Sequence, residues 1–249
     1  MKINTYKLSK LSKLFGIHAN TIRLYEKLGF IQEAKREANG YRIFTDIHLN
    51  QIKICRLIFG HPYTNRQIRQ LGYKVIEAAS ICESALCRLH TIEYIETIRK
   101  EIVKAQITTE MLNQWINLEV RPVTKNRYNR RQAADLLGTT IETVRNWERN
   151  GLISSNKYGA MNEKVFSDSD MERLRIIYML RQAGYSMSSI HRSLVMYDGG
   201  YRNLVLRLLN EPANEEDLLS AGDRWLSTLN ALECDAKEIL PLVDQMEKM

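Results

Sequence analysis

The chain repeats itself, and this repeat constrains its fold more than any other feature. When the sequence is shifted by 122 residues, two regions align without a gap. The matched pairs include Tyr6 with Tyr128, Gly16 with Gly138, Thr21 with Thr143, Arg23 with Arg145, Glu26 with Glu148, Gly29 with Gly151, Phe44 with Phe166 and Asp46 with Asp168. A register held over such a span predicts two copies of one module, at about 5–72 and 127–194.

Each copy begins with the pattern of two short helices joined by a glycine turn. The first helix is predicted over LSKLSKLF (8–15) and RRQAADLL (130–137), where apolar residues fall at helical spacing. A glycine follows each helix directly, which is where a tight turn needs a positive φ. A second helix follows, and we expect Thr140 to cap it in copy two and His18, a poor cap, to leave it frayed in copy one. We expect Leu28 in the core.

A short hairpin and further helices are predicted after this helix pair. In copy one, Asn39-Gly40 is a strong two-residue turn signal, and its flanks can pair as a hairpin wing. Amphipathic helices are predicted after it, starting at Thr45 in copy one and at Ser167 or Ser169 in copy two. One more short helix is expected in each copy, over 63–71 and 185–194. Helix, turn, helix and wing together indicate a winged helix-turn-helix module.

These residues resemble the DNA-binding domain of the MerR family of transcription regulators. The family motif is a glycine-turned helix pair followed by a wing and an Asp-led helix. Copy one reads Thr-Ile-Arg-Leu-Tyr-Glu (21–26), Gly-Phe-Ile (29–31) and Gly-Tyr-Arg-Ile-Phe (40–44), then Asp46. Copy two reads Thr-Val-Arg-Asn-Trp-Glu (143–148), Gly-Leu-Ile (151–153), then Phe166 and Asp168. The resemblance implies a mostly α fold with two winged helix-turn-helix domains.

The resemblance also implies which residues contact duplex DNA. The arginines of the second helix can pair with phosphate or guanine, and wing residues can hold backbone phosphates. The candidate DNA-binding residues are Asn20, Thr21, Arg23, Tyr25, Arg36, Tyr41, Arg42, Thr143, Arg145, Trp147, Lys157 and Lys164. For Tyr25 and Trp147, core packing is an equal alternative. Glu26 and Glu148 are expected to hold a local ion pair or a contact within the module rather than to touch DNA.

Copy two departs from the family pattern at the wing. Asn162-Glu163-Lys164 stands where copy one has Gly-Tyr-Arg, so a tyrosine and an arginine are lost and an acid is gained. Lys157, Tyr158 and Lys164 compensate in part. Copy two is therefore expected to bind DNA more weakly, to read a different sequence, or not to bind.

Two apolar seams at heptad-like spacing follow the modules. The first lies in a single long helix predicted over 75–119 and comprises Ile95, Ile98, Ile102, Ala105, Thr109, Leu112 and Ile116. The second comprises Trp225, Leu229, Leu232, Ala236, Ile239, Val243 and Met246, with Pro241 expected to break its helix in two. The seams can pair within one chain as a pseudo-dimer, which tethering favours, or between two chains as a homodimer.

The predicted domains are a first winged module at 1–74, a linking or dimerisation helix at 75–121, a second winged module at 122–196 and a helical region at 197–249. Charge follows this division. Residues 1–72 carry 13 Lys/Arg against 4 Asp/Glu (+9), and residues 127–196 carry 11 against 7 (+4). Residues 197–249 carry 5 against 11 (−6). Basic modules beside an acidic end favour a nucleic-acid partner modestly.

Other function classes find little support in the sequence. No phosphate loop, metal-ligand string or nucleophile motif is recognisable, so no enzyme, metal or cofactor is expected. Cys82, Cys87 and His90 lack the rest of a metal site, and Trp115, Tyr94 and Trp225 are interpreted as packing rather than as a ligand pocket. Four scattered cysteines, no signal segment and no membrane-length apolar run predict a cytoplasmic protein.

The sequence thus predicts a regulator that reads two half-sites on promoter or operator DNA with two unlike modules. By resemblance, it would distort the promoter for RNA polymerase. The alternative is an architectural or excisionase-like recombination accessory protein, which bends DNA without acting on transcription.

Overall fold

The computed structural model describes residues 4–61, 64–117, 126–154, 157–159, 164–210 and 225–248. Contacts divide the chain into two compact units, one of residues 1–100 with 229–249 and one of residues 101–228. Most described residues are helical, which confirms the predicted mostly α class with two winged helix-turn-helix modules. None of the described helices is both long enough and apolar enough to span a bilayer.

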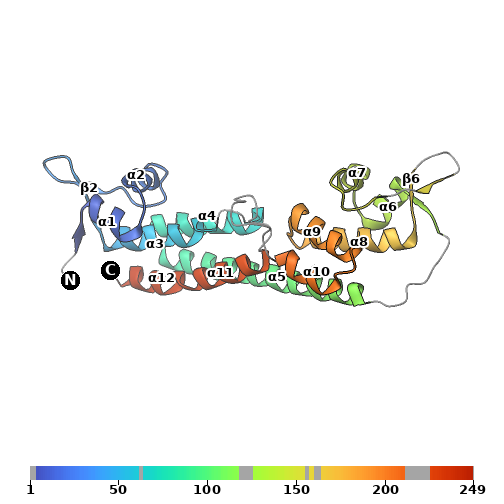
Figure 1. The fold of residues 1–249 in the computed structure, drawn as a ribbon. Coiled ribbons are helices and arrows are strands. Elements are labelled where there is room, and N and C mark those ends of the chain that lie inside the picture. Colours follow the sequence, from blue (N-terminus) through green and yellow to red (C-terminus); the bar gives the residue numbers. More distant parts are fainter. Residues whose placement is uncertain are drawn as a thin grey trace. The chain divides into compact units, whose positions relative to one another are not determined.

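The first unit opens with a winged helix-turn-helix module (Figure 1). Its elements are β1 (Thr5–Tyr6), α1 (Leu8–Phe15), α2 (Ala19–Lys27), β2 (Lys35–Arg36), β3 (Arg42–Thr45), α3 (Asp46–Phe59) and α4 (Arg66–Ser80). The three strands form an antiparallel sheet in the order β1-β3-β2. Tyr6 donates from its hydroxyl to Asp46 Oδ1 at 2.7 Å, which ties β1 to the start of α3.

The turn between α1 and α2 forms as the glycine predicts. Gly16 adopts φ 60°, in the left-handed region that a side chain disfavours. The predicted fraying of α2 is wrong, because His18 caps the helix: its Nδ1 accepts the backbone N–H of Asn20 at 3.2 Å. The core position predicted for Leu28 is also wrong. Leu28 is 53% exposed, because α2 has already ended at Lys27 and the chain turns away.

The wing hairpin is present, but its turn differs from the prediction. Strand pairing continues past Arg36 and Arg42 to Glu37 and Tyr41, where the Glu37 N–H donates to the Tyr41 carbonyl at 2.8 Å. The Gly40 N–H donates to the Glu37 carbonyl at 2.9 Å, with φ 82° at Gly40. The loop is therefore the three residues 38–40, a turn followed by a left-handed glycine, rather than a two-residue Asn-Gly turn.

The long helix begins later than predicted. The helix α4 runs to Ser80, and α5 (Ser84–Asn117) starts after a break at residues 81–83. Cys82 has φ 58°, a left-handed conformation that ends a helix. Residues 75–80 thus belong to the predicted short helix, which is longer than expected. The predicted helix end near Arg121-Pro122 lies outside the described residues.

In the first unit, α5 runs antiparallel to the C-terminal helices α11 (Trp225–Lys237) and α12 (Ile239–Glu247). Arg88 near the start of α5 donates to Asp244 at 2.5 Å, whereas Arg99, further along, donates to Glu233 at 2.7 Å. Apolar residues of both predicted seams are buried here, among them Ile95, Ile98, Leu229, Leu232, Ala236, Ile239, Val243 and Met246. The predicted break near Pro241 is confirmed, since α11 ends at Lys237 and Pro241 lies in the first turn of α12.

The second unit holds the second module. Its elements are β4 (Tyr128–Asn129), α6 (Arg130–Leu137), α7 (Ile141–Arg149), β5 (Lys157–Tyr158), β6 (Lys164–Phe166), α8 (Asp168–Gln182), α9 (Met187–Asp198) and α10 (Arg202–Asn210). Thr140 caps α7 as predicted, with its hydroxyl accepting the Thr143 N–H. Trp115 stacks on Tyr197 with ring centroids 4.3 Å apart, so this tryptophan is packing.

The cores of the two modules coincide under the 122-residue shift. The buried residues of copy one and their buried counterparts are Leu11 with Ala133, Ile22 with Val144, Phe44 with Phe166, Ile52 with Leu174 and Ile68 with Ile190. The sheet order β4-β6-β5 also repeats that of copy one. The same side-chain pattern therefore presents the same face of the second helix in both modules.

Candidate nucleic-acid interface

The second helix of copy one, α2, presents a polar and cationic outer face. Ile22 and Tyr25 point into the core, while Asn20, Arg23 and Lys27 are exposed. Asn20 Oδ1 accepts a hydrogen bond from Arg23 Nη1 at 2.7 Å. The pair holds an amide and a guanidinium side by side, the two groups that recognise adenine and guanine in the major groove. Thr21, also predicted as a contact, is half-buried beside them.

A groove of about 590 Å³ separates α2 from the wing. Its lining includes Lys7, Arg23, Asn39, Gly40, Tyr41 and Arg42. Tyr41 is 73% exposed at the wing, and Arg36 is exposed on β2. The groove thus brings Arg23 of the helix together with Tyr41 and Arg42 of the wing, whereas Asn20, Thr21 and Arg36 are not part of its lining.

Glu26 on α2 fastens the helix to the wing. One carboxylate oxygen accepts from Arg42 Nε at 2.6 Å, and the other accepts from the Ala34 N–H at 3.0 Å. The predicted local ion pair of Glu26 is confirmed. Arg42 therefore positions the wing as well as lying at the groove.

Tyr25 lies beneath α2 rather than on its outer face. It is 8% exposed, and its ring packs against Phe30 and Phe59 at centroid distances of 6.2 and 5.8 Å. Trp147 is likewise buried, with Tyr178 at 6.5 Å. These positions favour the packing alternative and correct the expectation that the two rings contact DNA directly.

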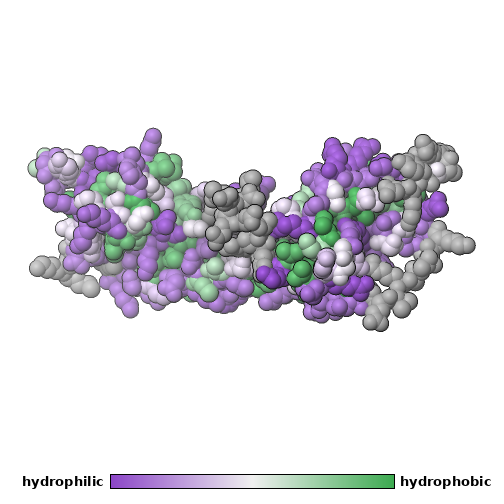
Figure 2. Space-filling model, in the orientation of Figure 1, coloured by the Kyte–Doolittle hydropathy of each residue, from purple (hydrophilic) through white to green (hydrophobic). Residues whose placement is uncertain are grey.

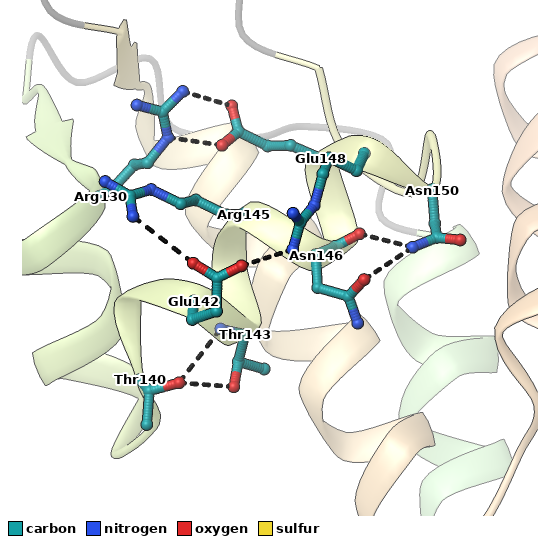
Figure 3. Close-up of polar contacts among 9 residues, drawn as sticks. Arg130, Thr140, Glu142, Thr143, Arg145, Asn146, Glu148 and Asn150 are labelled. Carbon is teal, nitrogen blue, oxygen red and sulfur yellow. Dashed lines mark hydrogen bonds and ion pairs between the residues drawn. The ribbon is translucent and has the colours of Figure 1, made fainter.

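In copy two, α7 carries an acid where α2 carries an amide. Glu142 stands at the position of Asn20, and its carboxylate pairs with Arg145 Nη1 at 3.4 Å and with Arg149 (Figure 3). All three side chains are more than half exposed. Figure 2 shows hydrophilic side chains gathered over α7. The face is polar like that of α2, but one carboxylate offsets one of its two guanidinium charges.

In copy two the recognition-helix glutamate is held by another helix rather than by the wing. Glu148, the counterpart of Glu26, accepts from Arg130 Nε at 2.5 Å, and Arg130 lies on α6 (Figure 3). Arg130 occupies the place of Leu8, and Lys164 the place of Arg42. Lys164 is half-buried at a groove of about 480 Å³ with Arg130, Glu142, Arg145 and Arg149. The Lys157 side chain, Asn162 and Glu163 lie outside the described residues.

The thiols and imidazoles do not assemble a metal site in the part of the chain that the structure describes. Cys87 is buried, and burial raises its pKa to about 11. Cys82 accepts from Gln32 Nε2 at 3.2 Å, while His90 lies 3.2 Å from Glu93. Cys82, Cys87 and His90 therefore each have a partner within the protein.

Sequence reasoning missed two functional residues of copy two. Glu142 could have been found, because Glu and Arg three residues apart on a helix commonly pair. The Arg130–Glu148 pair has no such local signal, since its partners come from different helices.

Two modules of this form, each with an exposed polar recognition helix beside a wing, define a winged helix-turn-helix DNA-binding protein. The model of the MerR family regulatory protein matches residues 7–44, and that of the MerR HTH family regulatory protein matches residues 128–196. The chain belongs to the MerR family and carries two MerR-type domains. It is a DNA-binding transcription regulator.

Relatives among characterised proteins agree with this assignment. The HTH-type transcriptional regulator CueR of Escherichia coli O157:H7 is 29% identical over 119 residues, covering 45% of this chain and 78% of CueR. A probable heavy metal-dependent transcriptional regulator of Haemophilus influenzae is 28% identical, over 43% of this chain and 83% of the relative. The mercuric resistance operon regulatory protein of Bacillus cereus is 26% identical, over 43% and 80%. The comparison with solved structures gave no match.

Proposed function

We propose that the chain reads two unlike half-sites on promoter DNA, with the module at 1–74 supplying most of the affinity and the module at 122–196 adding specificity. This proposal rests on one equivalent position at which the two recognition helices differ: Asn20 in copy one and Glu142 in copy two. Asn20 leaves Arg23 charged and available in copy one, whereas Glu142 pairs with Arg145 and Arg149 in copy two. A carboxylate on the contact face reduces phosphate attraction and accepts from cytosine N4.

The two half-sites would be joined by pairing within one chain. In the first unit, α5 already lies against α11 and α12 of the same chain through the Arg88–Asp244 and Arg99–Glu233 pairs. This supports the pseudo-dimer over the homodimer, because residues of both seams are covered without a second copy. The predicted domain division remains part of this proposal, with a helical end at 197–249 and a linking region at 75–121 whose long helix begins only at Ser84.

The proposal extends to distortion of the promoter so that RNA polymerase engages it. It rests on family membership and on two reading heads carried by one chain. Bending or untwisting the duplex between two contacted half-sites costs energy that depends on the intervening sequence. A gel assay with the site at permuted positions along a fragment measures such a bend directly.

Footprinting of duplexes selected from a random library tests the half-site proposal. We expect one asymmetric site with two protected segments, and we expect Glu142→Asn to change the preferred bases in one segment only. Protection of one segment, or of a perfect palindrome by two chains, would count against it. A promoter-reporter assay separates the regulator from the architectural alternative, which would leave transcription unchanged.

Several relatives carry names that refer to heavy metals or mercuric resistance. The described residues contain no group of three or more His, Cys, Asp or Glu that could hold an ion.

A further inference from the structure

The first unit contains a pocket of about 360 Å³ beneath the DNA-reading module. It lies at the turn between α3 and α4 and extends to α5. Its described lining is Ile58, Phe59, His61, Thr64, Arg69, Tyr73 and Tyr94. Apolar and aromatic walls with a few polar groups are typical of pockets that bind small molecules.

The polar residues that line this pocket differ in exposure: Tyr94 is buried, whereas Arg69 is exposed. Tyr94 is 2% exposed, and burial together with the nearby Asp235 carboxylate raises the pKa of its phenol. Arg69 is exposed and uses one nitrogen, Nη2, to donate to the Thr64 carbonyl at 3.0 Å. His61 Nε2 lies 2.8 Å from Asp235 and is thereby engaged. Arg69 is thus the lining cation with no carboxylate partner among the described residues, and Tyr94 contributes a phenol to the lining.

The aromatic wall of the pocket continues to the recognition helix. Phe59 and Tyr73 line the pocket with ring centroids 5.8 Å apart. Phe59 in turn contacts Phe30 at 5.4 Å and Tyr25 at 5.8 Å. Tyr25 is a buried residue of α2 itself. A molecule packed against Phe59 therefore touches the ring cluster on which α2 rests.

In copy two an indole of the protein itself lies at the corresponding turn. The turn between α8 and α9 contains Gly184, and the Trp225 indole packs so closely that a Cβ there would lie 2.5 Å from it. The ring cluster is not repeated, because Phe30, Phe59 and Tyr73 correspond to Leu152, Arg181 and Val195. In copy two a planar indole of the protein thus covers this turn.

We propose that the pocket of copy one binds a planar aromatic molecule carrying a carboxylate, and that this ligand changes the DNA affinity of the first module. The ring lies against Phe59 and Tyr73, the carboxylate pairs with Arg69, and the Tyr94 hydroxyl meets a polar atom of the ligand. The regulatory half of the proposal rests on the proposed DNA-binding function; the binding half does not.

Calorimetric titration of the full chain with three indoles of different charge tests the ligand class. Indole-3-acetate is expected to bind at least about tenfold more tightly than indole or tryptamine, because a guanidinium favours the anion. Arg69→Gln should weaken indole-3-acetate about tenfold, and Tyr94→Phe about threefold. Arg66→Gln removes an exposed arginine of α4 outside the lining and should change nothing. Equal affinity for all three indoles, no binding at millimolar concentration, or equal effects of Arg69→Gln and Arg66→Gln would overturn the assignment.

Fluorescence anisotropy with the selected duplex tests the regulation. Saturating indole-3-acetate is expected to change the DNA affinity at least about fivefold, a common size for coupling between sites. Phe30→Leu introduces the residue of copy two outside the pocket lining, and it should reduce this coupling while leaving the affinity for indole-3-acetate intact. Bound ligand without any change in DNA affinity would overturn the regulatory claim. Failure of the ligand-free chain to bind DNA would instead overturn the proposed function.

Discussion

Glu142 lies three residues before Arg145 on α7 and accepts a hydrogen bond of 3.4 Å from its guanidinium. Because the same carboxylate also pairs with Arg149, it offsets cationic charge on the face that would meet phosphate. Glu142→Asn should therefore raise the affinity for non-specific duplex about threefold to tenfold at low salt. The reciprocal Asn20→Glu should lower it. Electrophoretic mobility shifts at several salt concentrations measure both, and an unchanged affinity for Glu142→Asn would speak against this account.

The two recognition-helix arginines are expected to contribute unequally. Arg23→Ala should cost about 1–3 kcal/mol of binding to the selected site, because Arg23 is exposed beside a neutral amide. Arg145→Ala should cost less, since Glu142 already engages that guanidinium. Binding isotherms of the two variants provide the comparison. Equal losses would remove our ranking of the modules.

Two glycines of the second unit make a matched test of packing. Gly184 and Gly200 have φ 98° and 83°, but a Cβ at Gly184 would meet Trp225, whereas one at Gly200 has open space. Gly200→Ala should cost only the backbone strain, about 1–2 kcal/mol. Gly184→Ala should lower the free energy of unfolding by about 1–3 kcal/mol more. Urea denaturation of both variants gives the difference, and a difference near zero would show that Trp225 does not cover this turn.

The cysteines should differ sharply in reactivity. Burial raises the pKa of Cys55 to about 12 and that of Cys87 to about 11, so both stay protonated at pH 8. Cys234 is exposed. Iodoacetamide at pH 8 is therefore expected to modify Cys234 first and to spare Cys55 and Cys87 until denaturant is added. Mass mapping of the modified peptides gives the order in which the cysteines react. Early labelling of Cys87 would contradict the burial described here.

The helix-turn-helix pairs were predictable because local signals agree. Gly16 and Gly138 follow amphipathic helices and stand in one register, so turn chemistry and repeat support each other. The break before α5 was not predictable, because the apolar pattern continues through residues 81–83 and Cys82 is not a residue type that favours a left-handed turn. The wing loop was misjudged because Asn39-Gly40 fits a two-residue turn equally well.

The DNA-binding face was predictable only in part. Motif position pointed to Arg23 and Tyr41, which are exposed, but also to Tyr25 and Trp147, which the fold buries. A sequence motif specifies which residue type occupies a position. It does not show whether that side chain is exposed to solvent. The partner of the recognition-helix glutamate is Arg42 of the wing in copy one but Arg130 of α6 in copy two. This change depends on tertiary contacts between different elements.

The antiparallel pairing of α5 with α11 and α12 of the same chain has a genetic consequence. In a regulator built from two identical chains, every mutation alters both halves of the assembly together. Here a single codon change, such as one at Asn20 or at Glu142, alters one head and leaves the other as it was. If one chain reads both half-sites, as we propose, it can follow an operator whose two arms diverge in sequence.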